Sequence, residues 1–132
     1  MDVESRIPQL LDLLGQLLAA ESIPFGHIVP NSLPAKPGVY RIFETALPSD
    51  TVYIGRTVSL RSRIYRSHLM GNRGVSTLKR KLIRDGRYPA ETDVKAYIRH
   101  DCCVQYIIIP AAVDRIRLEH FGIALLRPWY ND

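Results

Sequence analysis

The sequence is poor in cysteine and aromatic residues, and it has no long apolar run. Its two cysteines, Cys102 and Cys103, are adjacent, so they can neither form a disulfide of ordinary geometry nor act as a metal knuckle. This excludes a disulfide-stapled scaffold, and we interpret both as reduced core residues. The richest apolar window, residues 10–20, is broken by polar residues, and Asp2 and Glu4 stand where a secretory signal would be basic. We therefore expect a cytoplasmic protein with no membrane partner.

The chain is 132 residues long, 46% hydrophobic and 23% charged, which fits one soluble domain with a real core. Its charge is unevenly distributed. From Arg56 to Arg99, twelve Lys or Arg residues face three acids, a balance of +9, whereas the remainder carries six bases and ten acids, or −4. A concentrated basic middle is typical of proteins that bind polyanions, although solvated helix faces would give the same composition.

The amino-terminal region predicts one helix and a connector. Leucines at helical spacing predict a helix over residues 7–20, capped by Ser5, that covers the domain with a mainly core-facing stripe. Residues 21–37 hold four prolines and predict an extended connector. We divide the chain accordingly into residues 1–36, packed on the domain, and a main domain of residues 37–132.

Two alternating apolar runs, residues 39–43 and 51–54, predict a β-hairpin. If the strands pair, Tyr40 and Tyr53 lie near one another, and Gly55 allows a sharp turn after the second strand. A basic segment follows at once. Two phenols beside a row of guanidinium groups suggest a phosphate-handling site.

Further along, the pattern predicts a helix from about residue 58 to 70, with Arg63 on the side of Leu60. It also predicts a helix from Ser76 to Arg84, a short helix capped by Thr92, a buried strand over 104–109 and a helix over 112–126. The glycine at 86 ends the second of these helices. Its basic residues are expected to face outward (Lys79, Arg80, Lys81 and Arg84).

Glu119 lies on an apolar stripe of the last helix, between Ile116 and Ile123. A carboxylate there is costly to bury unless it is paired or binds a cation. Two readings stay open. Arg63 or Arg115 pairs with it, or it holds a hard metal ion whose shell is completed by water and phosphate oxygens, as is usual for magnesium.

The order of these elements resembles the GIY-YIG nuclease family. Gly38-Val39-Tyr40 is followed by Tyr53-Ile54-Gly55, an arginine eight residues beyond that glycine, a helical glutamate and a terminal Pro-x-Tyr-Asn. The similarity covers residues 37–131. It implies an α/β sandwich with a small antiparallel three-stranded sheet flanked by helices, to which this chain adds an amino-terminal helix.

The resemblance places Tyr40, Tyr53, Arg63, Glu119 and Asn131 in an active site for divalent-metal-dependent hydrolysis of DNA. It implies Mg²⁺ or Mn²⁺ at Glu119, phosphate stabilisation by Arg63 and Tyr40 as general base. Nearby positive charge would have to lower the pKa of Tyr40, since a free phenol titrates near 10. Tyr53 would orient water or a phosphate oxygen, and Asn131 would fix local geometry.

The chain departs from the family pattern at two places. Many members carry His or Tyr four residues after the arginine, where this chain has Ser67; either His68 or Tyr65 would substitute, and we favour His68 because imidazole can shuttle a proton near pH 7. Arg56 replaces the Lys or small residue that often follows the second tripeptide, which keeps charge but changes reach.

The basic residues expected to contact nucleic acid are Arg56, Arg61, Arg66, Arg73, Lys79 and Arg80. RNA is not excluded as the substrate. Residues 1–36 are too few for an independent sequence-reading module, so specificity would come from loops, a homodimer or an accessory protein. The competing hypothesis is a non-catalytic nucleic-acid-binding module on the same scaffold.

Overall fold

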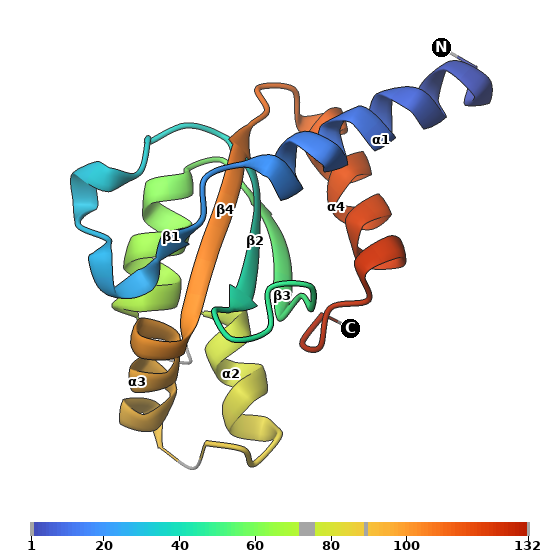
Figure 1. Cartoon of the computed structure of the whole chain (residues 1–132). Helices are drawn as coiled ribbons and strands as arrows, with labels where there is room; N and C mark the ends of the chain where they lie inside the picture. The colour runs from blue at the N-terminus through green and yellow to red at the C-terminus, as the bar shows by residue number, and fades with distance from the viewer. Residues whose placement is uncertain (1, 72–75, 89, 132) are drawn as a thin grey trace.

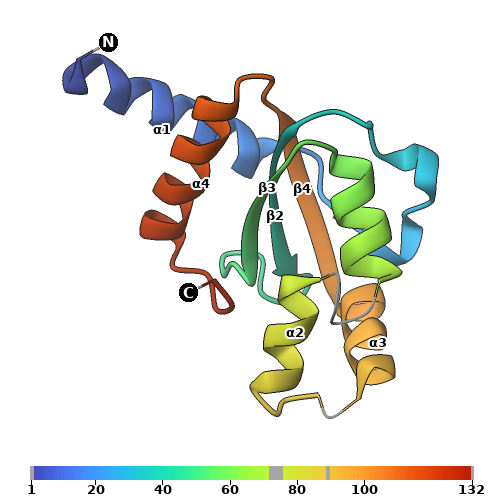
Figure 2. The same cartoon turned by 180° about the vertical axis from the view of Figure 1, so that it is seen from behind.

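A four-stranded antiparallel sheet divides the protein into two helical layers (Figure 1). The structure is a computed structural model, which describes residues 2–71, 76–88 and 90–131. The strand order is β1-β4-β2-β3. Helices α1 (Val3–Ala19) and α4 (Ala112–Leu126) cover one face, while the segment η3 (Arg61–Leu69), α2 (Thr77–Arg84) and α3 (Glu91–Asp101) lie on the other (Figures 1 and 2).

The α/β class is confirmed, but the prediction of three strands is wrong. Strand β1 (Ile23–Pro24) pairs with β4 (Cys102–Ile108) and adds a fourth strand at the edge. It comes from the proline-rich segment predicted as a connector, which also contains two single 3₁₀ turns, η1 (Phe25–His27) and η2 (Pro30–Ser32). A proline is tolerated at a sheet edge because the edge side of the strand needs no amide donor.

The predicted hairpin is confirmed as β2 (Gly38–Glu44) and β3 (Tyr53–Thr57), which pair antiparallel. Gly55 does not form the expected turn, because it lies within β3 opposite Tyr40. A Cβ atom at Gly55 would lie 2.3 Å from the Tyr40 hydroxyl oxygen. The glycine therefore provides the space that the Tyr40 ring fills.

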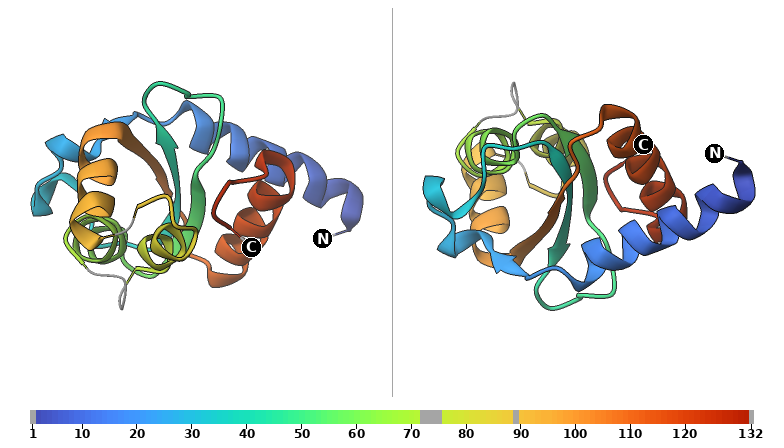
Figure 3. Two further views of the ribbon diagram at one scale, coloured as in Figure 1. Left: turned by 90° about the horizontal axis from the view of Figure 1, so that it is seen from below. Right: turned by 90° about the horizontal axis from the view of Figure 1, so that it is seen from above.

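Helix α1 begins earlier than predicted, because Asp2 and not Ser5 caps it. The Asp2 carboxylate accepts a hydrogen bond of 2.8 Å from the backbone N–H of Ser5. The leucine stripe is only partly core: Leu14 and Leu17 are buried, Leu10 and Leu13 are half-buried, and Leu11 and Leu18 are exposed. The amino-terminal half of α1 extends beyond the rest of the domain (Figure 3).

Other elements follow the sequence pattern closely. Ser76 caps α2, Gly86 follows it with a φ of 78°, and α4 begins and ends where predicted. The third helix is capped by Ala90 rather than Thr92. Both cysteines are buried and free, as predicted. Within the described residues, no helix is long and apolar enough to span a membrane.

The core has two parts, one on each face of the sheet. Leu118 of α4 and Leu17 of α1 pack on Val39 and Ile54. On the opposite face, the larger cluster joins Tyr40 and other sheet residues to η3, α2 and α3. Since side chains alternate across a strand, β3 directs Tyr53 and Ile54 to opposite faces, and residues from both layers meet around this edge strand.

Candidate active site

Tyr40 and Tyr53 lie together with His68 on the η3 face of the sheet. The two phenol ring centroids are 6.2 Å apart, and the His68 ring lies 5.4 Å from Tyr40 and 5.6 Å from Tyr53. The predicted closeness of the two tyrosines is therefore confirmed. Tyr40 is 1% exposed and Tyr53 is half-buried, so Tyr53 is the more accessible phenol.

A π-helix places the histidine beside the tyrosines. Segment η3 was predicted as an ordinary α-helix, but its bonding is wider, as the 3.0 Å bond from the Met70 N–H to the Tyr65 carbonyl shows. In a π-helix a residue lies one turn above the residue five places before it. His68, five residues after Arg63, therefore lies one turn beyond it. In an α-helix that position would belong to Ser67. Ser67 is directed elsewhere, its hydroxyl lying 3.4 Å from the Ser62 carbonyl.

Both ring nitrogens of His68 are engaged. Nε2 is 2.6 Å from the Tyr40 hydroxyl, and Nδ1 is 2.8 Å from the Ser76 hydroxyl, which also accepts a hydrogen bond from the Lys79 N–H. A chain of contacts thus runs from the cap of α2 to Tyr40. Sequence reasoning identified Ser76 only as a cap. Its spacing from the histidine gave no sign of this second contact.

The pKa of Tyr40 is raised well above its usual value, chiefly because burial disfavours the phenolate. The positive charge of Arg63 acts in the opposite direction, and the charges of Tyr53 and Glu119 add to the increase. The expected lowering of this pKa is therefore wrong for the protein without substrate or metal. The same effects show that Tyr53, Arg63 and Glu119 all lie within electrostatic reach of the Tyr40 hydroxyl.

His68 is fully buried, and its pKa is lowered to about 3 by desolvation, with Arg63 and Lys79 adding to the effect. The imidazole is therefore neutral near pH 7. This does not support the expectation that His68 shuttles a proton near pH 7. A neutral ring can still accept one hydrogen bond and donate another.

Acid should destabilise the protein through His68. Its folded pKa lies below the unfolded value of 6.5, so its contribution is complete above pH 6.5 and is lost as the pH falls toward 3. Between pH 7 and 5 we expect a loss of about 2 kcal/mol in the free energy of unfolding from this group. Urea denaturation of the unmodified protein and of His68→Gln measures the difference.

The exposed His27 supplies the matched control, because His27→Gln should keep the full acid loss. If His68→Gln loses as much stability between pH 7 and 5 as the unmodified protein, burial of a neutral His68 does not cause the effect.

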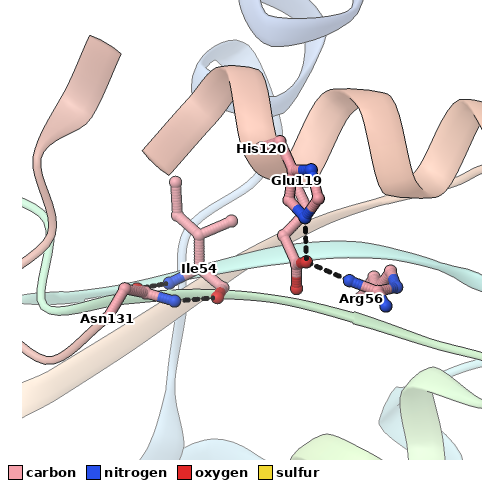
Figure 4. A network of polar contacts seen from close by, with 5 residues as sticks. All are labelled: Ile54, Arg56, Glu119, His120 and Asn131. Atoms are coloured by element: carbon pink, nitrogen blue, oxygen red, sulfur yellow. Dashed lines mark hydrogen bonds and ion pairs between the residues drawn. The ribbon is translucent and has the colours of Figure 1, made fainter. Parts of the chain in front are cut away.

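Glu119 approaches the site from α4, on the other side of β3 (Figure 4). Its Oε1 forms an ion pair with Nη1 of Arg56 and lies 3.9 Å from Nε2 of His120. The Glu119 side chain is 13% exposed and that of Arg56 is 43% exposed. Arg56 is thus the observed partner. Arg115 instead donates to two backbone carbonyls.

The residues present fit a metal held by a single protein carboxylate. No group of three or more His, Cys, Asp or Glu side chains among the described residues is arranged to hold an ion. Both contacts of Glu119 engage Oε1, so Oε2 is the oxygen we expect to face a ligand. An ion with one protein ligand and several waters is a common arrangement for Mg²⁺.

Asn131 fixes the backbone of β3, as predicted (Figure 4). Its carboxamide accepts a hydrogen bond from the Ile54 N–H and donates one to the Ile54 carbonyl, each 2.8 Å long. Ile54 stands between Tyr53 and Gly55, so this clamp holds the strand that carries one phenol and makes room for the other.

The basic residues predicted to contact nucleic acid differ in their exposure. Arg56, Arg66 and Arg80 are exposed, and Arg61 is partly buried, with its Nε donating to the Leu33 carbonyl. Lys79 was predicted to face outward, which is wrong. It is buried, and its Nζ donates to the carbonyls of Leu69 and Gly71. Arg73 lies outside the described residues.

No protein-family model matches the chain, and no curated protein matches it. Solved structures of the GIY-YIG N-terminal endonuclease domain of UvrC from Thermotoga maritima are similar to it. The magnesium-bound form is 22% identical, with a TM-score of 0.48 and 100% of each chain covered. A point mutant bound to its catalytic divalent cation is 24% identical, with a TM-score of 0.48, covering 76% of this chain and 87% of that one. In the order of its motifs, and in the meeting of Tyr40, Tyr53, Arg63 and Glu119 around one strand, this chain resembles the GIY-YIG nuclease family.

Proposed function

We propose that the protein is a divalent-metal-dependent endonuclease that hydrolyses DNA phosphodiester bonds. The observation that supports this most strongly is the clustering of two phenols, a neutral imidazole, a guanidinium and a carboxylate around the edge strand β3. These groups can bind a phosphate, hold a cation and handle a proton, which are the requirements of phosphodiester hydrolysis.

Glu119 would hold Mg²⁺ or Mn²⁺ through a single carboxylate oxygen, Oε2, and water and phosphate oxygens would complete the shell. When bound, the metal would polarise the scissile phosphate and stabilise the leaving oxygen. Arg56 forms an ion pair with the same carboxylate in the protein alone. Arg63 would offset negative charge on the phosphoryl oxygens.

Tyr40 would act on the attacking water through a neutral phenol. We assign its hydroxyl hydrogen to Nε2 of His68, because a phenol is a better donor than the Ser76 hydroxyl and Nδ1–H can then donate to Ser76. The Tyr40 oxygen is left with lone pairs that would orient the attacking water, and it would take the proton of that water once the positive charge of Arg63 and a bound metal has let the phenol lose its own proton to solvent. Tyr53, the more accessible phenol, would orient the water or a phosphate oxygen.

DNA would lie against the exposed arginines at positions 56, 66 and 80. A basic surface of this kind does not by itself distinguish DNA from RNA. The substrate assay must therefore include both polymers.

The proposal is tested by incubating the purified protein with supercoiled plasmid, labelled duplex and single-stranded DNA, and labelled RNA. We expect nicked or shortened DNA with Mg²⁺ or Mn²⁺, and none with EDTA. The reason is that the metal would supply the positive charge that polarises the scissile phosphate. Salt-dependent binding without cleavage under either ion would contradict the nuclease and favour a non-catalytic binding module. Preferential cleavage of RNA would keep the reaction and change the substrate.

A further inference from the structure

We call Tyr40, Tyr53, Arg63, His68 and Glu119 the catalytic cluster. A cavity of about 290 Å³ lies beside it, where the end of β3 meets the starts of η3 and α4. This volume corresponds to about ten water molecules at ~30 Å³ each. Its lining is basic and apolar and contains no acidic residue among those that the structure describes (Arg56, Thr57, Val58, Arg63, Ala112, Arg115 and Ile116).

Arg115 is the deepest positive charge of this cavity. The residue is 9% exposed, and its Nη1 donates to the carbonyls of Ile109 at 2.9 Å and Pro110 at 2.8 Å. Among the described residues, no carboxylate forms an ion pair with it. A buried cation is costly without an anion. The two carbonyls orient the guanidinium but do not neutralise it.

The other arginines connect this cavity to the catalytic cluster. Arg56 lines the cavity and pairs with Glu119, and Arg63 lines it while acting electrostatically on Tyr40. The cavity also meets the first residue of α4, Ala112, whose preceding cap residue makes no side-chain bond to the helix. The positive end of the helix dipole therefore adds to the three guanidinium groups.

We propose that this cavity binds the phosphate next to the scissile phosphate on the same DNA strand, with Arg115 as its buried anchor. The inference rests on the proposed function, since the neighbouring phosphate has meaning only if Arg63 and Glu119 handle the scissile one. It adds Arg115 and the start of α4 to the DNA-binding surface. It also gives Arg56 two anionic neighbours, the Glu119 carboxylate and a DNA phosphate.

The test introduces a negative charge without removing the buried arginine. Ala112→Glu places a carboxylate at the cavity and is compatible with the fold, because acidic residues are favourable in the first turn of a helix. Val113→Glu is the matched control, since Val113 is exposed on the same turn and does not line the cavity. Affinity for a fluorescent DNA duplex is measured by anisotropy in EDTA, over a range of salt concentrations.

We expect Ala112→Glu to weaken DNA binding about tenfold at 0.1 M salt and to reduce the slope of log K against log salt by about one phosphate contact. Val113→Glu should change both much less. Equal losses in the two variants, or no loss in Ala112→Glu, would overturn the cavity as a phosphate site. Neither result would contradict the proposed nuclease function, because the cleavage assay of the unmodified protein tests that function separately.

Discussion

Replacing Glu119 with glutamine is expected to slow DNA cleavage by about 10³-fold or more, because it removes the only charge with which the protein is proposed to hold the metal. The shape of the side chain is kept, and the amide oxygen can still accept a hydrogen bond from Arg56. Folding should therefore change little. DNA binding in EDTA should stay equal or become slightly tighter, because one negative charge has been lost. Cleavage is measured in single-turnover reactions over a range of Mg²⁺ concentrations.

Asp114→Asn is the matched control, because Asp114 lies on the same helix and outside the cluster. It should retain nearly full cleavage. Undiminished cleavage by Glu119→Gln would contradict the assignment of Glu119 as the metal ligand. A defect that high Mg²⁺ fully rescues would indicate that Glu119 supports affinity for the ion and that other groups complete the site.

Removing the Tyr40 hydroxyl is expected to have the second largest effect, a loss of about 10²–10⁴-fold in cleavage for Tyr40→Phe, the range typical of a general base. The phenyl ring still fills the space over Gly55. The change leaves Nε2 of His68 without its partner, so the free energy of unfolding should fall by about 1–3 kcal/mol. Chemical denaturation and single-turnover cleavage are measured on the same variant.

Tyr97→Phe provides the comparison, because Tyr97 is also buried and donates a 2.6 Å hydrogen bond to Glu44 away from the cluster. It should lose stability to a similar extent and keep its cleavage rate. If Tyr40→Phe cleaves normally, the role of base passes to Tyr53, whose phenol is more accessible.

The hairpin could be predicted from the sequence because local patterns determine it. Alternation over residues 39–43 and 51–54 sets the strands, and their pairing brings Tyr40 and Tyr53 together. Glu119 was identified for a similar reason, since a carboxylate on an apolar helix stripe stands out. Its partner was missed because Arg56 is distant in the chain and joins it only through the packing of α4 on β3.

Other features depend on tertiary contacts that leave little trace in the sequence. Strand β1 has two residues and includes a proline, so nothing local distinguishes it from a loop. Lys79 has the composition of a surface residue, but the carbonyls of Leu69 and Gly71 hold it in the core. The π-helix is equally hidden, because an ordinary helical pattern does not reveal one extra residue per turn. That extra residue is why His68 lies where spacing alone would place Ser67.

The contacts of Ser76 and Lys79 make the start of α2 and the end of η3 behave as one unit. Ser76 reaches His68, while Lys79 reaches the carbonyls of Leu69 and Gly71. A slip of α2 by a single residue would break both anchors together and leave Nδ1 of the imidazole, whose Nε2 contacts the Tyr40 hydroxyl, without its Ser76 partner. Sequence changes in α2 can therefore alter the chemistry at Tyr40 while every residue of the catalytic cluster stays the same.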